Sequence, residues 1–427
     1  MAGKNSKKTL QTNLILPMQP HHDEFLETMT KIFKWSQFIG IVGRGSRIWK
    51  VWGLLLLLVL LAIEGGAIWK VIKALAGWAV DTTGQRSVTA RLAGTMFYSS
   101  VVASQILCTR FAWSWGNLSS FWVSVEKTMA LNIPPDPKLR KRMLTALGIM
   151  ALCSIVEHTI SVISLVGFDC PPELILRRYT LRSHGFLFLR TEYSVFFAIP
   201  LLLISNIATV LWNFQDALVV LICMGLTSRY CRLNQYVAKF CVEENKLAKG
   251  NNMKAEAVRL YSWRKIREAY VKQATLVRKV DESIGGIILL TSFGNFYFIC
   301  LQLFMGITEG LFGTVVIKQV YYFVSLFWIV IRFTWMVLAA AEVHVQSRNA
   351  LQYIHTCHSR YYNVEIERLQ NQLNKDYVVL SGMGFFSIDR NILLKMATAV
   401  VTYELVLIQF DNKGGADSAP ANGTGQQ

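Results

Sequence analysis

NILLKMATAVVTYELVLIQF, residues 391–410, decides the fold: it is long enough to cross a bilayer as one helix, yet it carries an unusual polar load. On a repeat of about 3.6 residues, one face of that helix collects Thr398, Thr402, Val406 and Gln409. Polar side chains are costly against lipid, so this face must meet protein or water. Two interpretations fit: a contact between packed helices, or the lining of a pore shared by copies of the helix. The pattern alone favours packing.

The composition places the whole chain in a membrane. Of its 427 residues, 53% are hydrophobic and 17% are charged, and mean hydropathy is +0.35, which is too apolar for a soluble protein of this size. The polar, basic N-terminal segment has no signal-peptide pattern, so the first span is expected to direct insertion. The predicted fold is therefore all-α, with seven transmembrane helices at about 51–69, 92–113, 143–168, 193–227, 284–307, 321–341 and 392–410.

Lysine and arginine are distributed unevenly between the segments that join these spans. Segments 1–50, 114–142, 228–283 and 342–391 hold 31 of them, whereas 70–91, 169–192, 308–320 and 411–427 hold 10. Positive residues favour the cytoplasmic side, which predicts a cytoplasmic N-terminus and an extracellular C-terminus. The net charge of +17 therefore indicates contact with inner-leaflet membrane lipids and not with nucleic acid.

This topology divides the chain into five parts. They are a cytoplasmic N-terminal segment (1–50), a six-helix transmembrane region with cytoplasmic extensions (51–341), a cytoplasmic anchor segment (342–391), the last helix (392–410) and an extracellular tail (411–427). Residues 25–38 are amphipathic and are expected to lie on the inner membrane surface. Residues 237–283 and 365–374 mix charged and apolar positions at helical spacing, which predicts a cytoplasmic helical bundle.

No pattern of catalytic or metal-ligating residues stands out. The chain lacks GxSxG, HExxH and phosphate-loop motifs, so neither an enzyme nor a cofactor or metal site is expected. Seven of the eight cysteines fall in spans or inner segments, with only Cys170 clearly outside, which argues against a disulfide framework. No internal repeat of the kind seen in many transporters is present.

Polar and aromatic side chains also occur within the earlier spans, mostly in their outer halves. The candidate ligand-contacting residues are Tyr98, Ser104, Glu157, His158, Ser161, Tyr297, Gln302, Tyr322 and Trp328. An acid inside a span predicts a functional site, but pairing of Glu157 with Arg332 of the sixth span explains it equally well. Aromatic residues often only anchor helices at the interface. Together, however, rings and hydroxyl, amide and carboxylate groups suit a sugar, which offers C–H faces and hydroxyls.

Three stretches carry a resemblance to a known family. Thr402-Tyr403 and Gln409-Phe410, separated by five residues at the end of the last span, form a TY…QF pattern. Residues 380–397 (LSGMGFFSIDRNILLKMA) precede it, and residues 212–236 read WNFQDALVVLICMGLTSRYCRLNQY. These stretches resemble the insect gustatory receptor family, in its sugar-sensing branch. The run Ala397-Thr398-Ala399 departs from the glycine-containing run of that branch, which leaves the helix packing there open.

The resemblance implies a sugar-gated, non-selective cation channel in the plasma membrane of taste neurons. It implies four subunits, as a homotetramer or with related receptor subunits, that conduct monovalent and divalent cations. The last helix of each would line the pore, with Gln409 and Phe410 at the outer constriction and Val406 one turn inside. A ring of phenylalanine closes a pore by dewetting. The sugar would bind in an outer-half pocket of each subunit, between spans two and six.

Three other classes compete with this interpretation. A seven-span G-protein-coupled receptor fits the number of spans, but the inverted topology and the absence of DRY-like and NPxxY-like motifs argue against it. A transporter is disfavoured by the missing repeats. A channel that resembles the insect odorant receptors and takes a non-sugar ligand also stays open, since the sequence does not identify the ligand.

Overall fold

The computed structural model describes residues 24–79, 87–128, 131, 133–187, 189–249, 256–308, 315–357 and 362–417. Long helices dominate these residues, joined by short 3₁₀ turns at Gln37–Ile39, Pro172–Leu174 and Arg190–Glu192. The helices are α1 (Glu24–Ser36), α2 (Arg47–Leu75), α3 (Val88–Thr128), α4 (Leu139–Val166), α5 (Ile175–Ser183), α6 (Val195–Lys249), α7 (Glu256–Thr308), α8 (Val316–Arg348), α9 (Ala350–Ile354), α10 (Val364–Lys375) and α11 (Asn391–Asp417). The all-α prediction is confirmed.

Six of these helices, α2, α3, α4, α6, α7 and α8, are long and apolar enough to cross a membrane. They contain the first six predicted spans, apart from two residues past the end of α4 and two residues before the start of α6. The seventh predicted span lies within α11, which begins at Asn391, one residue earlier than predicted. The side chains of α11 after Val406 lie outside the described part of the chain. The orientation of the termini remains a prediction.

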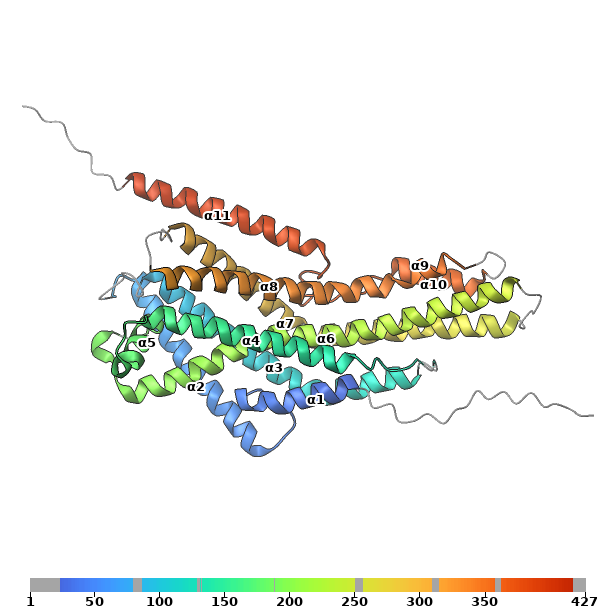
Figure 1. Cartoon of the computed structure of the whole chain (residues 1–427), viewed down its shortest axis with the longest axis horizontal. Coiled ribbons are helices and arrows are strands. Elements are labelled where there is room, and N and C mark those ends of the chain that lie inside the picture. Colours follow the sequence, from blue (N-terminus) through green and yellow to red (C-terminus); the bar gives the residue numbers. More distant parts are fainter. Residues whose placement is uncertain are drawn as a thin grey trace, which may run out of the picture.

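Two helices extend far beyond a bilayer. α6 and α7 have 55 and 53 residues, or about 80 Å each, against a hydrocarbon core of roughly 30 Å. Their extensions lie side by side, next to α9 and α10 (Figure 1). Tyr270 donates a hydrogen bond to the Asn234 side chain at 2.6 Å, and Arg267 pairs with Glu365 of α10 at 2.7 Å. Helices are therefore present at 365–374 and at 237–249 and 256–283, and residues 250–255 of the predicted segment lie outside the described part of the chain. α8 runs unbroken through the predicted boundary at residue 342.

The expected position of the N-terminal amphipathic helix on the membrane surface is not what the structure shows. The apolar face of α1 is buried against protein: Phe25 stacks on Trp122 with ring centroids 4.6 Å apart, and Phe33 lies 5.4 Å from Trp115. A Cβ atom on Gly225 of α6 would clash with the Phe25 ring, so the close approach depends on glycine there. Aromatic side chains in the last turns of α3 thus cover the apolar face of α1, which was expected to contact lipid.

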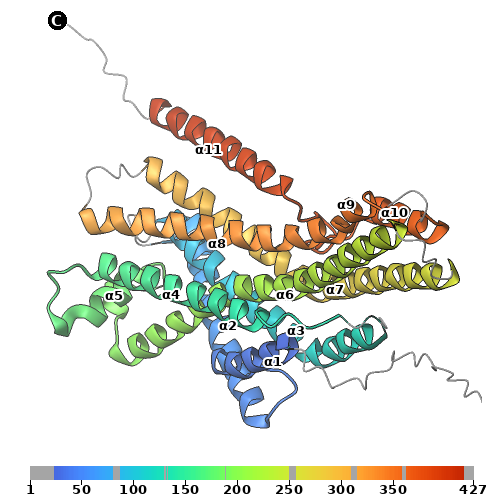
Figure 2. The same cartoon turned by 45° about the vertical axis from the view of Figure 1, so that its right-hand side comes forward.

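α11 lies at the edge of the bundle, where it contacts α7 and α8, and its first turns lie near the middle of α8 (Figures 1 and 2). The preceding segment fixes where it begins. Ser381 donates hydrogen bonds to Asp281 of α7 through its backbone N–H (2.6 Å) and its hydroxyl (2.8 Å). Arg390 pairs with Glu342 of α8 at 3.1 Å, and Asp389 accepts from the N–H of Ile392. The start of α11 is therefore tied to α7 and α8.

Candidate functional site

The two sides of α11 differ in what they meet. Ile392 and Glu404 are buried, with Met396 and Val400 half-buried between them, and this side packs on α7 and α8. The opposite side is exposed in the single chain and contains three residues of the predicted stripe: Thr398, Thr402 and Val406. The helix thus packs on its own subunit through a mostly apolar side that includes Glu404, and it leaves the threonine stripe exposed. The side chains of Gln409 and Phe410 fall outside the described part of the chain.

The two threonine hydroxyls of the stripe are oriented by their own helix. Thr398 donates to the carbonyl of Leu394 at 3.0 Å, and Thr402 donates to the carbonyl of Thr398 at 2.9 Å. Each hydroxyl hydrogen is therefore occupied, which leaves the oxygen lone pairs for outside partners. A stripe of acceptor oxygens suits hydrated cations better than anions.

A second cluster joins three helices in the bundle. The Gln302 side-chain amide of α7 donates to the Ser325 hydroxyl of α8 at 2.9 Å, and Ser325 donates to the Glu157 carboxylate of α4 at 3.1 Å. Tyr321 of α8 bonds to Ser161 and to Ser325. Three of the predicted ligand-contacting residues, Glu157, Ser161 and Gln302, are therefore brought together. The carbonyl oxygen of Gln302 is buried without a partner in this part of the structure, so the cluster retains hydrogen-bonding capacity.

A charged network adjoins this cluster. The guanidinium of Arg332 is buried and pairs with Asp216 of α6 at 2.7 Å, and it donates to Asn295 of α7 at 2.9 Å and to Asn213. It also lies over the Trp212 ring, 4.4 Å from the centroid. Asp216 is thus the direct ion-pair partner of Arg332, and the pairing with Glu157, one of the two alternatives left open by the sequence, is not the ion pair that the structure shows.

A cavity of about 390 Å³ lies between α4 and α6 beside both groups. His158 lines it, next to Glu157, and so does Asn213, which binds Arg332. Ligand pockets commonly have volumes of roughly 300–1,000 Å³, so the space is adequate for a small molecule. Trp328 lies one turn from Ser325, packed on Met150 and Ala217, which also line the cavity. Its indole N–H has no partner among the described residues.

The other candidate residues lie elsewhere. Tyr98 is buried and hydrogen-bonds with His184 at 2.9 Å, and Ser104 is fully buried and donates to the Leu211 carbonyl at 3.4 Å. Tyr297 lies near Tyr403 of α11, and Tyr322 lies near Glu404. The nine residues therefore do not form a single pocket, although two of them are close enough to the last helix for an electrostatic interaction.

Comparison with known proteins identifies the family. The sequence profile described as trehalose receptor matches residues 49–418. This chain belongs to the trehalose receptor family. Its Drosophila melanogaster relatives include the gustatory receptor for sugar taste 64a, which is 30% identical over 332 residues (74% of this chain and 69% of the relative). Gustatory receptor 5a for trehalose is 28% identical over 332 residues, which cover 77% and 71% of the two chains. The predicted resemblance to sugar-sensing gustatory receptors is confirmed.

Two solved structures of another receptor resemble the fold of this trehalose receptor family member. The insect olfactory receptor OR5 from Machilis hrabei superposes with a TM-score of 0.61 at 14% identity, covering 91% of this chain and 100% of that one. Its complex with eugenol gives a TM-score of 0.63 at 13% identity and the same coverage. At this identity the likeness establishes the shared helical fold. The relatives are receptors, as expected for a chain without catalytic motifs, and the six spanning helices make this family member a membrane protein.

Proposed function

We propose that this chain is one subunit of a sugar-gated, non-selective cation channel, in which the α11 helices of four subunits line a central pore. The observation that carries this proposal is the exposed stripe of Thr398, Thr402 and Val406 on a helix whose other side packs on its own subunit. A polar stripe in a bilayer needs water or protein to face. Copies of α11 around an axis, from identical or related subunits in the plasma membrane, supply both.

Permeation and closure follow from side-chain chemistry. The threonine oxygens replace part of the water around passing monovalent and divalent cations. Phe410 forms an apolar ring that dewets and closes the outer end of the pore, and Gln409 provides a wettable surface when the helices rotate. The N-terminus lies in the cytoplasm and the C-terminus outside, following the distribution of Lys and Arg.

The sugar site lies at the Glu157–Ser325–Gln302 cluster and the cavity beside it. The free Gln302 oxygen and the Trp328 N–H serve sugar hydroxyls, and the Trp328 ring offers an apolar face. Binding opens the channel only if the sugar prefers the open arrangement. Tyr322, on the same helix as Ser325, lies near Glu404 of α11 and couples the site to the pore helix.

Whole-cell current in cells that express only this chain tests the proposal, with G-protein signalling blocked and trehalose, other disaccharides and monosaccharides applied in turn. We expect a rapid cation current with one or a few sugars. A response that disappears when G proteins are blocked would instead indicate a G-protein-coupled receptor. Surface biotinylation shows whether the chain reaches the cell surface. Co-expression of a related subunit shows whether a heteromer is required for current.

A channel with a non-sugar ligand is the second candidate. It is favoured by the cavity between α4 and α6, which is lined largely by apolar side chains, and by the shared fold with an olfactory receptor that binds eugenol. Adding phenolic and terpene odorants to the panel separates the candidates. Current with odorants and none with sugars would replace the sugar assignment and leave the pore assignment intact.

A further inference from the structure

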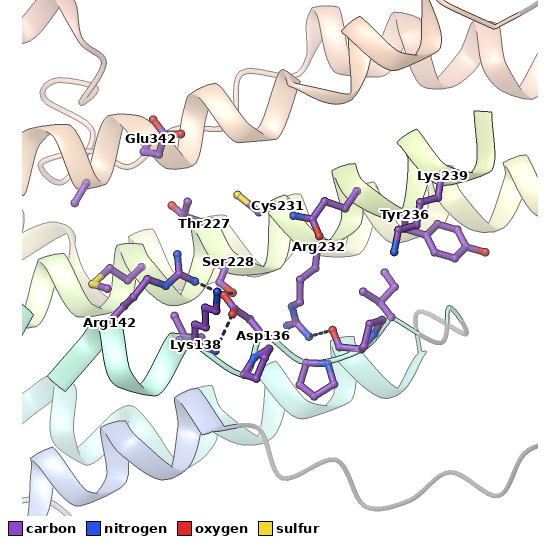
Figure 3. A pocket seen from close by; sticks show the side chains of 18 residues that line it. Asp136, Lys138, Arg142, Thr227, Ser228, Cys231, Arg232, Tyr236, Lys239 and Glu342 are labelled. Atoms are coloured by element: carbon purple, nitrogen blue, oxygen red, sulfur yellow. Dashed lines mark hydrogen bonds and ion pairs between the residues drawn. The ribbon is translucent and has the colours of Figure 1, made fainter. Parts of the chain in front are cut away.

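A second and larger cavity lies at the opposite end of the spans, outside the sugar site and the pore. Its volume is about 800 Å³, and it lies between the segment that precedes α4, the middle of α6 and α8 (Figure 3). Arg142, Ser228 and Glu342 line it. Each of these residues directly adjoins an end of a predicted span, namely 143–168, 193–227 and 321–341. The cavity therefore lies at the level where lipid headgroups meet the protein on the predicted cytoplasmic side.

The charge along this cavity is predominantly positive. Its lining contains four cationic residues, Lys138, Arg142, Arg232 and Lys239, and two acidic ones, Asp136 and Glu342. Both acids are already engaged: Asp136 with Arg142 and the Ser228 hydroxyl, and Glu342 with Arg390. Within the described residues, Lys138 and Lys239 are exposed and form no ion pair. Two lysines are therefore available for an anionic ligand.

The arrangement of the cations indicates a ligand with more than one phosphate. Figure 3 shows Lys138 and Arg142 near one end of the cavity and Lys239 at the other. Ser228 and Lys239, eleven positions apart on α6, are separated by about 16 Å along the helix axis. A single phosphate cannot contact both ends. The N-terminus of α4, which begins at Leu139, adds a favourable dipole beside Lys138.

We propose that this cavity binds the headgroup of an inner-leaflet lipid with several phosphates, a phosphorylated phosphatidylinositol. Basic pockets between spans on the cytoplasmic side suit such headgroups. The cavity also adjoins the last helix, because Glu342 in its lining holds Arg390 just before α11. This proposal depends on the predicted topology but not on sugar gating, so its test measures binding and not current.

The test is the affinity of the purified full-length protein for fluorescent phosphatidylinositol bisphosphate in mixed micelles. The variant Lys138→Gln/Lys239→Gln removes the two unpaired lysines, and Lys246→Gln/Lys375→Gln, which changes two exposed lysines outside the cavity, is the matched control. We expect the first variant to bind at least about tenfold more weakly and the control to bind as the wild type does.

Competitors distinguish the possible sources of the anion. We expect phosphatidylserine at equal total charge to compete poorly, and soluble inositol trisphosphate to bind much more weakly than the lipid. Equal competition by phosphatidylserine, or an equal loss of affinity in both variants, would show that binding reflects nonspecific surface charge and not this site. Soluble inositol trisphosphate that binds as tightly as the lipid would overturn the lipid assignment, and unchanged binding in the first variant would overturn the site.

Discussion

Glu157 accepts a hydrogen bond from Ser325 across two helices, and Ser325 in turn accepts one from Gln302. Glu157→Gln keeps the shape of this side chain but removes its charge. A hydrogen bond to a charged group contributes about 1.5–3 kcal/mol, so we expect the sugar concentration for half-maximal current to rise by about tenfold or more. Surface expression should remain unchanged.

The matched control for Glu157 is Glu64, another buried carboxylate within a span, which accepts a hydrogen bond from Ser99 at 2.5 Å. Glu64→Gln should leave the sugar dose–response curve in place. If both variants shift the curve equally, or neither does, Glu157 has no specific part in sugar recognition.

Arg332 and Asp216 form a buried ion pair, and removal of one partner leaves the other charge without compensation. Such a loss costs about 3–5 kcal/mol, whereas replacement of both partners by apolar residues is often tolerated. We expect Arg332→Met to lower the melting temperature of the purified protein markedly, and Arg332→Met/Asp216→Leu to recover part of that loss. Additive destabilisation in the double variant would contradict the assigned pairing.

His184, in the predicted outer segment 169–192, is buried, and burial lowers its pKa to about 4. The unfolded value is about 6.5, so folding favours the neutral ring, and its contribution to stability is complete only above pH 6.5. As the pH falls from 6.5 towards 4 this contribution is lost, by about 2 kcal/mol at pH 5. The melting temperature should therefore fall more between pH 7 and pH 5 in the wild type than in His184→Gln. Equal falls would contradict this role.

The sequence predicts the exposed and the packed side of α11 more directly than those of the other helices. Threonines at a spacing of four predict a polar face directly, and the structure leaves Thr398 and Thr402 exposed while Val400 packs inward. We expect Thr398→Val/Thr402→Val to leave the melting temperature of the subunit within experimental error, because both side chains are exposed and their hydroxyls bond to carbonyls of the same helix. Single-channel conductance should fall by about half or more, since acceptor oxygens leave the stripe. Unchanged conductance would place this face outside the pore.

The end of the same helix carries a separate prediction. Phe410→Ser replaces an apolar ring by a wettable one, so resting current without sugar should rise several-fold. Leak current at matched surface expression measures this effect. A basal current equal to that of the wild type would remove Phe410 from the gate.

At the scale of the whole molecule, patterns within one helix were predictable and contacts between helices were not. Hydropathy predicts the first six spans, and helical spacing predicts the extensions of α6 and α7. Periodicity within one span does not say which helix it faces, so Arg332 was recognised as a buried charge but its partner Asp216 was not. Asp216 lies within the stretch 212–236 quoted above, and an acidic residue inside a predicted span was the feature from which a partner for Arg332 could have been inferred. Similarly, the apolar face of α1 was assigned to lipid although α3 covers it.

The central claim, that copies of α11 surround the ion path, is tested most directly by thiol modification of Thr402→Cys. A charged methanethiosulfonate reagent is applied from outside during sugar-evoked current. Val400→Cys, on the packed side of the same helix, and the wild type with its eight native cysteines are the controls. We predict rapid block of Thr402→Cys, faster with sugar than without, and little effect on either control. Current that is unaffected in Thr402→Cys, or reduced equally in Val400→Cys, would contradict a pore lined by this helix.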